Sequence, residues 1–340
     1  MHLPRLSLFI IVTLFILLDF VHGFSNNKVI DSQTLTDDIR SDRTITVDAD
    51  GNGDFKSVQA AIDHIPNRNS KWIMIHVAKG VYREKVKIPR SKPYIFMRGE
   101  GSGKTSIVWS RSSADDYESA TFKVEAKNFI AYGITFKNAA PTGIDRTKQN
   151  KAVAVVVGAD KAAFYHCSFI SNHNTLFDAR GRHYYGACYV QGSVDVIFGH
   201  GQSMFHECEV FVVPNMRSEI RGSITASHKQ RGNATGGFAL VKSKVYGVDN
   251  NVYLGRAKGT HSTVVYADTY LSDSVVSHGW TDWSYPHSKE NLHLAEYNCH
   301  GPGAATHKRT NWSKQLSYED ALRFMTVDFI NGKDWLPAWL

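Results

Sequence analysis

One short phrase occurs three times near the middle of the chain, as FYHCSFI (164–170), YYGACYV (184–190) and MFHECEV (204–210). The cysteines of these phrases, Cys167, Cys188 and Cys208, are 21 and 20 residues apart. Each phrase is rich in residues that favour β-strands, and the segments between them are rich in Gly, Asn, Asp and Ser. Strands that recur at this spacing, with little helical periodicity between them, predict a solenoid of parallel coils.

A solenoid predicts the environment of the cysteines. Equivalent positions of successive coils stack, so Cys167, Cys188 and Cys208 should form a ladder inside the protein. We expect small buried side chains rather than disulfide partners or reactive thiols. With Cys299 there are four cysteines, too few for a disulfide-built scaffold, and they lack metal-site spacing. An antiparallel sandwich is the competing fold, but it requires tight hairpin turns that this stretch mostly lacks.

Short helices are expected near both ends of the solenoid. Residues 54–63 place Val58, Ala61 and Ile62 on one helical face, which suits a cap over the first coil. The phrase SYEDALRF (317–324), with Ser317 as N-cap, predicts a second short helix. No linker or low-complexity boundary interrupts residues 43–340. The expected fold is therefore all-β, a single parallel β-helix with short capping helices.

The N-terminal segment resembles a secretory signal peptide. Arg5 precedes thirteen mostly apolar residues (6–18), and Gly23 ends a plausible cleavage region. This stretch is too short for a membrane span, and no later stretch is long and apolar enough for one. We therefore expect a signal peptide at 1–23, a short segment at 24–42 and the folded domain at 43–340, in a secreted, extracellular protein.

The overall composition is that of a soluble globular protein, 42% hydrophobic and 21% charged. The formal net charge of +7 will attract polyanions, which outside the cell are acidic polysaccharides or anionic lipids more often than nucleic acid. No nucleic-acid motif is visible, and no membrane partner is expected. The histidines show no clustered ligand pattern, so neither a metal nor another cofactor is expected. Asn233 and Asn311 begin glycosylation acceptor patterns, which fit secretion.

The phrase GSVDVIFG (192–199) places a carboxylate, Asp195, in an apolar run that otherwise predicts a buried strand. An isolated carboxylate is costly to bury, so such residues are usually paired, hydrogen-bonded or functional. Asp195 is therefore the first candidate for a functional residue.

Eight phrases follow one another along the chain: GVYREKV (80–86), SATFKV (119–124), AVAVVV (152–157), GSVDVIFG (192–199), YLGRAKG (253–259), GW..W (279–283), AEYNCHGPGA (295–304) and FINGKDWLP (329–337). In this order they resemble the plant pectin methylesterase (pectinesterase) family. The resemblance covers residues 43–340 and implies a right-handed parallel β-helix of the plant cell wall. It also implies a short member of the family, without the long propeptide that many members carry.

The resemblance assigns roles to several residues. Asp195 matches the nucleophile that attacks the methyl ester of a galacturonate unit, and Arg256 matches the arginine that holds it and contacts substrate. Thr121 and Trp280 match substrate-binding positions, with Trp280 favoured over Trp283 as a ring that stacks on sugar. The chemistry is reasonable, because a carboxylate kept ionised by a guanidinium can form an acyl-enzyme anhydride. The alternative is an Asp–Arg pair that only ties two coils together.

Other catalytic positions of the family are changed in this chain. The family phrase Q-D-T-L reads H-N-T-L at 173–176, so Asn174 stands at the general acid and base position. His173 and Lys151 stand where two glutamines donate hydrogen bonds in the transition state, and Lys258 replaces a tryptophan of the sugar-binding wall. An amide does not exchange protons near neutral pH, so Asn174 cannot be the acid.

These changes predict slow hydrolysis of pectin methyl esters. Losing a general acid lowers a rate by ~10²–10⁴-fold, and losing one oxyanion donor lowers it by ~10²–10³-fold. The alternative is an active esterase that uses other side chains for the same steps: His173 would transfer the proton and Lys151 would stabilise the oxyanion. Asp178 is a possible stand-in carboxylate, although we expect it on a solvated turn. Glu84 is expected to make a structural hydrogen bond.

A second class of function is non-catalytic. The protein would then bind methyl-esterified homogalacturonan (pectin), or a proteinaceous pectinesterase inhibitor, in the wall. A third class is a β-helix polysaccharide lyase or glycosidase. Those enzymes require an acidic calcium cluster or a paired-carboxylate site, and neither is found at the motif positions.

Overall fold

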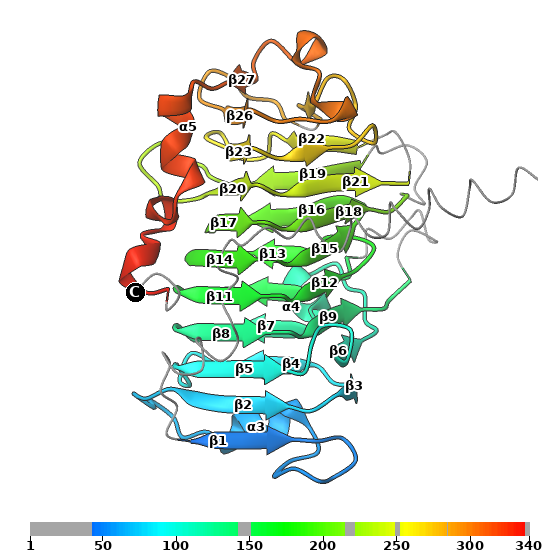
Figure 1. The fold of residues 1–340 in the computed structure, drawn as a ribbon, viewed down its shortest axis with the longest axis vertical. Helices are drawn as coiled ribbons and strands as arrows, with labels where there is room; N and C mark the ends of the chain where they lie inside the picture. The colour runs from blue at the N-terminus through cyan, green and yellow to red at the C-terminus, as the bar shows by residue number, and fades with distance from the viewer. Residues whose placement is uncertain (1–42, 142–150, 215–221, 249–251, 284, 337–340) are drawn as a thin grey trace, which may run out of the picture. The chain divides into compact units, whose positions relative to one another are not determined.

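The computed structural model describes residues 43–141, 151–214, 222–248, 252–283 and 285–336. The signal peptide expected at 1–23 and the segment expected at 24–42 lie outside these residues. Within them the chain winds into stacked coils that form three parallel sheets, so the protein is a parallel β-helix (Figure 1). No helix of the described residues is long and apolar enough to cross a bilayer.

Among the described residues, eight successive coils contribute one strand to each sheet, and sheet A has three further strands at the ends of the stack. Sheet A contains β1 (Thr44–Val47), β2 (Ile73–Val77), β5 (Ile95–Gly99), β8 (Phe129–Tyr132), β11 (Ala162–Tyr165), β14 (Arg182–Gly186), β17 (Gln202–His206), β20 (Gly237–Val241), β23 (Thr263–Ala267), β26 (His293–Tyr297) and β27 (Lys314–Gln315). Sheet B contains β3 (Gly80–Tyr82), β6 (Thr105–Trp109), β9 (Thr135–Asn138), β12 (Ser168–Ile170), β15 (Tyr189–Gly192), β18 (Glu209–Val212), β21 (Lys244–Gly247) and β24 (Tyr270–Leu271). Sheet C contains β4 (Val86–Ile88), β7 (Phe122–Val124), β10 (Val155–Val157), β13 (Leu176–Asp178), β16 (Val194–Gly199), β19 (Gly222–Ser227), β22 (Val252–Arg256) and β25 (Trp280–Thr281).

The corner between sheets A and B is a tight bend that recurs from coil to coil. Seven successive coils place a residue with positive φ there: Gly133 (64°), His166 (51°), Ala187 (48°), Glu207 (55°), Lys242 (51°), Asp268 (49°) and Asn298 (46°). A left-handed conformation costs an L-residue ~1–2 kcal/mol. Packing of the flanking strands against neighbouring coils must therefore offset that strain in six of the seven coils.

The three repeated cysteines follow these corners directly and lie in successive coils. The backbone N–H of Tyr189 donates to the carbonyl of Cys167 at 2.9 Å, and that of Glu209 donates to Cys188 at 2.8 Å. All three thiols are free and buried, which raises the pKa of Cys167 to about 12. The predicted ladder of small buried side chains is confirmed.

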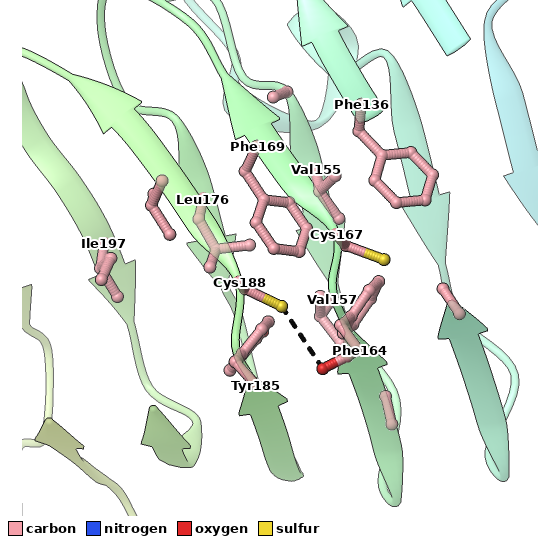
Figure 2. Close-up of a cluster of buried hydrophobic side chains, with 14 of the residues drawn as sticks. Phe136, Val155, Val157, Phe164, Cys167, Phe169, Leu176, Tyr185, Cys188 and Ile197 are labelled. Carbon is pink, nitrogen blue, oxygen red and sulfur yellow. Dashed lines mark hydrogen bonds between the residues drawn. The ribbon is translucent and has the colours of Figure 1, made fainter. Parts of the chain in front are cut away.

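Aromatic rings stack inside the same coils (Figure 2). The rings of Phe164 and Tyr185 are 5.3 Å apart and 6° from parallel, and those of Tyr185 and Phe205 are 4.4 Å apart and 3° from parallel. The Cys188 thiol donates to the carbonyl of Phe164 at 3.4 Å beside this stack. Stacked rings of this kind add ~0.5–1.5 kcal/mol beyond their buried area, so the repeat holds neighbouring coils in register.

The helix at the start of the solenoid is α3 (Val58–His64), and Ser57 is its N-cap. Its buried residues are Val58, Ala61 and Ile62, and it packs against β1 and β4, as the sequence predicted. The carboxylate of Glu84 accepts hydrogen bonds from the first two backbone N–H groups of the helix, at 2.7 and 2.8 Å. The structural role expected for Glu84 is therefore confirmed.

The second expected helix is α5 (Tyr318–Met325), whose N-cap Ser317 accepts from the backbone N–H of Asp320. It packs along sheet A against β20 and β23 rather than over an end of the stack (Figure 1). Short 3₁₀ helices precede and follow it: η1 (Pro302–Ala304), η2 (Thr306–Lys308), η3 (Val327–Ile330) and η4 (Gly332–Asp334). The side chain of Gln202 donates to the carbonyl of Phe329 at 2.6 Å and fastens η3 to β17. The helix was correctly predicted, but it covers a face instead of capping an end.

Candidate active site

The local structure of β16 explains how a carboxylate is accommodated in an apolar strand. The pairing of β16 with β19 shifts register between Val194 and Ile197, and Asp195 takes a left-handed conformation with φ 47°. Such a bulge changes the direction of a side chain within a strand. Val196 and Ile197 are fully buried in the core, whereas the Asp195 side chain is 9% exposed. Asp195 thus lies at the edge of the core, within reach of other coils.

Arg256, the last residue of β22, holds both carboxylate oxygens of Asp195. Its Nε donates to Oδ1 at 2.7 Å and its Nη2 donates to Oδ2 at 2.5 Å, so the predicted ion pair is confirmed. The hydroxyl of Ser223 in β19 also donates to Oδ1 at 2.8 Å. Burial alone would raise the pKa of Asp195, but the Arg256 and Ser223 hydrogen bonds and the guanidinium charge bring it below its usual value. The carboxylate is therefore ionised and fixed in position.

Asn174 and His173 lie directly before β13, beside the coil of Asp195. The backbone N–H of Asn174 donates to the carbonyl of Val194 at 3.1 Å. The side-chain Oδ1 of Asn174 lies 3.0 Å from Nδ1 of His173, and its Nδ2 donates to Oδ1 of Asp116 at 3.4 Å. The first contact is a hydrogen bond only when Nδ1 of His173 carries the proton. Asn174 is thus oriented with its amide nitrogen towards a carboxylate.

That carboxylate, Asp116, was missed by the sequence analysis. It is the first residue of α4 (Asp116–Ser119), its side chain is 16% exposed, and its Oδ2 accepts from Nζ of Lys151 at 2.7 Å. Burial raises the pKa of Asp116, the Lys151 ammonium opposes that effect, and the charges of Asp115 and Asp195 add to the increase. The pKa of Asp116 is therefore above its usual value. The only sequence signal was two adjacent aspartates just before the SATF phrase.

A further cationic group, Lys258, lies near Asp195. Its side chain is exposed, but partial desolvation and the charges of Arg256 and Lys151 lower its pKa, while the charge of Asp195 has the opposite effect. The guanidinium carbon of Arg256 lies 4.8 Å from the centre of the Trp283 ring. Lys151 and Arg256 are each paired with a carboxylate, Asp116 and Asp195, and Lys258 adds a third cation to this region.

Two residues expected to bind substrate are buried in the core instead. Trp280 is 1% exposed, and its indole N–H donates to Glu296 at 3.4 Å. Thr121 has no exposed surface, and its hydroxyl donates to the carbonyl of Lys137 at 3.1 Å. Both side chains are buried in this structure, and the substrate contacts expected of them remain predictions. Trp283, which is 41% exposed beside Arg256, is the ring that faces outward.

The expectation for Asp178 is also wrong. This residue ends β13 and has no exposed surface, so it does not lie on a solvated turn. Its Oδ2 accepts from Tyr185 at 2.8 Å and from Ser203 at 2.7 Å, and it lies 2.9 Å from Nδ1 of His183. The network explains why a carboxylate is tolerated there, and it removes Asp178 as a stand-in catalytic group. The described residues contain no group of three potential ligands placed to hold a metal ion.

Comparisons with known proteins agree with this architecture. The family model described as Pectinesterase matches residues 44–333. A relative from Arabidopsis thaliana, "Probable pectinesterase 67", is 54% identical over 310 residues, which cover 91% of this chain and 90% of that protein. "Pectinesterase QRT1" from the same plant is 36% identical over 305 residues, covering 86% and 79%.

Solved structures show the same similarity. A pectin methylesterase from carrot superimposes with a TM-score of 0.81 and 29% identity, over 87% of this chain and 95% of that one. A pectin methylesterase from Aspergillus niger superimposes with a TM-score of 0.75 and 26% identity, over 88% of this chain and 96% of that one. Fold and sequence therefore lead to one family.

Proposed function

The chain belongs to the pectinesterase family, and on that premise we propose that it hydrolyses the methyl esters of galacturonate units in pectin, with Asp195 as the nucleophile. The observation that carries the proposal is the Asp195–Arg256 pair, in which both guanidinium contacts keep a nearly buried carboxylate ionised. A nucleophile must be both charged and aimed, and this pair supplies both conditions.

The hydrogen bonds of Asp195 indicate which oxygen attacks. Oδ1 accepts from both Arg256 and Ser223, whereas Oδ2 accepts from Arg256 alone among the described residues. Oδ2 therefore retains a lone pair for the ester carbonyl. Attack gives a tetrahedral oxyanion, whose collapse expels methanol and leaves an anhydride between galacturonate and Asp195. Water then cleaves the anhydride and restores the carboxylate.

Proton transfer is the weak point of this site. The expelled methoxide is a poor leaving group and needs a proton, and the amide of Asn174 has none to give. A missing general acid lowers a rate by ~10²–10⁴-fold. We therefore propose that this protein releases methanol more slowly than relatives with aspartate at this position.

The second candidate function is a non-catalytic wall protein that binds pectin or a pectinesterase inhibitor. Asn174 favours it, because the position for the acid carries no titratable group. Lys258 also favours it, since its exposed ammonium would bind acidic polysaccharide without any chemistry. Under either function the protein acts in the plant cell wall, after removal of the signal peptide expected at 1–23.

Methanol release and pectin affinity, measured on the same purified protein, separate the two functions. We expect slow methanol release from the unmodified chain and none from Asp195→Asn, which keeps the shape of the side chain but removes its charge. Both proteins should bind pectin. Equal background release from the two proteins, with pectin binding intact, would instead establish the non-catalytic function.

A further inference from the structure

We propose that Asp116 performs the proton transfers that Asn174 cannot, as the general acid and then the general base of ester hydrolysis. The proposal rests on the proposed function, because it presupposes attack by Asp195. It places a carboxylate from a different element of the fold, α4, at the acid–base position.

The position of Asp116 supports this role. Nδ2 of Asn174 donates to Oδ1 of Asp116 at 3.4 Å, so the two side chains are neighbours. Asn174 is in turn bonded through its backbone to Val194, the residue before Asp195. The Asp195 charge contributes to the raised pKa of Asp116, so the two carboxylates act on each other electrostatically. A substrate ester attacked by Asp195 would therefore have its leaving oxygen beside the Asp116–Asn174 pair.

The environment of Asp116 suits a group that gains and loses a proton. A side chain that is 16% exposed is largely desolvated, which favours its neutral form. Lys151 at 2.7 Å favours the charged form, and Asp115 and Asp195 favour the neutral one. These opposing effects leave the pKa above the usual value, in the direction that a general acid requires.

The chemistry balances with this single residue. As the tetrahedral intermediate collapses, its C–O bond to the methoxy group breaks and the proton of Asp116 passes to that oxygen, so methanol leaves. Asp116 is then a carboxylate and accepts a proton from the water that attacks the anhydride. The water oxygen bonds to the galacturonate carbonyl carbon, the bond to Asp195 breaks, and Asp116 is again the acid. The galacturonic acid product ionises in solvent.

Lys151 and Asn174 then act as positioning residues. Lys151 occupies Oδ2 of Asp116, and the Asn174 amide occupies Oδ1. Nδ1 of His173 lies 3.0 Å from the Asn174 oxygen, which directs the amide nitrogen towards Asp116. The Asn174 amide therefore fixes the orientation of the Asp116 carboxyl group.

The first test is an exchange of the two positions, with methanol release from methyl-esterified pectin as the assay. We expect Asp116→Asn to lower kcat by ~10²-fold or more, with KM within about threefold. Asp116→Asn combined with Asn174→Asp should recover at least tenfold, because the acid returns at the neighbouring position. The matched control is Glu118→Gln, which removes a carboxylate of the same helix that is 59% exposed and should leave kcat within about twofold.

The second test is the pH dependence of methanol release, which a merely structural role of Asp116 would not affect. Activity should fall as pH rises through the pKa of Asp116, because the acid form is lost. Lys151→Gln removes the ammonium that lowers this pKa, so the alkaline limb should move to higher pH. In an Asp116→Asn background the same substitution should leave the limb unchanged. If Asp116→Asn does not fold, as judged by circular dichroism, the shift in Lys151→Gln alone decides the question.

The outcomes distinguish this inference from the proposed function. If the unmodified chain and Asp195→Asn release no methanol, the proposed function itself is wrong. If Asp195→Asn abolishes release but Asp116→Asn stays within threefold of the unmodified chain, the function stands and Asp116 is not the acid. Asp116→Asn could also lower kcat while the exchange variant recovers nothing and Lys151→Gln leaves the alkaline limb in place. Asp116 would then only hold Lys151 in position, and the proposal would be overturned.

Discussion

The Asp195–Arg256 pair shows how a charged residue can occupy a β-strand next to the core. Both side chains are less than a tenth exposed, so each charge depends on the other for its stability. Removing one partner of such a pair typically destabilises a protein by ~3–5 kcal/mol, because the remaining charge is left uncompensated. A change that keeps the charge but alters its geometry is therefore more informative than a deletion.

Arg256→Lys should shift the acid limb of methanol release to higher pH. Lysine offers one point charge in place of a two-pronged contact, so the pKa of Asp195 should rise towards its usual value. A carboxylate with a depressed folded pKa stabilises the fold above its unfolded pKa of ~3.9 and loses that contribution as pH falls through the folded pKa. Stability at neutral pH should therefore also decrease.

The control is Arg182→Lys, because Arg182 makes a similar two-pronged contact with Asp160 in another part of the fold. It should leave the pH profile of methanol release unchanged. The pH–rate profiles of both variants are measured. An equal shift of the acid limb in the two would show that the profile does not report on the ionisation of Asp195.

Asn174→Asp should raise methanol release, by ~10-fold or more if proton transfer limits the rate. The new carboxylate would lie next to Asp116, and two adjacent carboxylates retain one proton at higher pH than either alone. Asn172→Asp is the control, since Asn172 is exposed two residues away and adds the same charge. No increase in the first variant, with folding and pectin binding intact, would mean that another step limits turnover.

The sequence was sufficient to predict the ion pair of Asp195 and Arg256, because both residues lie in local phrases that recur in a known family. It was not sufficient for Asp116, whose contact with Asn174 joins segments 58 residues apart. It also favoured Trp280 over Trp283, because no sequence pattern indicated which side of the short strand β25 faces the core. Burial of Asp178 was equally invisible, since its partners His183, Tyr185 and Ser203 lie in sheet A strands of two coils.

At the scale of single elements, the corners between sheets A and B are the most regular feature of the fold. Each is formed by one residue in the left-handed region, and only one of the seven is glycine. These corners follow sheet A strands directly and precede the cysteine ladder. The strain at each corner should therefore be measurable by substitution.

Ala187→Gly should stabilise the protein by ~0.5–1 kcal/mol. Glycine removes the ~1–2 kcal/mol penalty of the left-handed conformation and adds ~0.5–1 kcal/mol of backbone entropy loss. Ala187 is exposed, so no buried methyl group is lost. Ala162→Gly in β11 is the matched control and should destabilise, because Ala162 is fully buried in a strand. Urea denaturation checks both, and a loss of stability in Ala187→Gly would show that the corner is not strained.

The repeat was predictable at this scale because cysteine, aromatic and polar positions recur with the coil. The position of α5 was not predictable. Its sequence specifies a capped amphipathic helix that buries Ala321 and Phe324, but it does not indicate which surface of the stack covers them. Packing against β20 and β23 determines the position of α5 along sheet A.

At the scale of the whole molecule, the net charge of +7 acts together with the cations near Asp195. A long polyanion would be attracted by the general charge and held by the local one. Electrostatic attraction of exposed charges weakens as salt shortens the screening length, from ~30 Å at 0.01 M to ~10 Å at 0.1 M. Affinity for de-esterified pectin should therefore fall steeply over this range.

Lys258→Ala should weaken that affinity and reduce its dependence on salt. Lys104→Ala, at an exposed position before β6, lowers the net charge equally and should have a smaller effect. Binding isotherms at several salt concentrations make the comparison. Equal effects of the two variants would show that general charge, and not the region around Asp195, determines binding.

The stacked coils also determine how the molecule responds to tension along the stack. Ladder hydrogen bonds join each coil to the next, so a pull on the last coil opens one ladder at a time. Cys167 and Cys188 are 21 residues apart. A coil of that length would release roughly 70 Å of extended chain from a layer about 4.8 Å thick. The bond from Gln202 to Phe329 means that the C-terminal segment must detach before the coils beneath it unwind. Under load the molecule should lengthen in many small steps instead of rupturing in one.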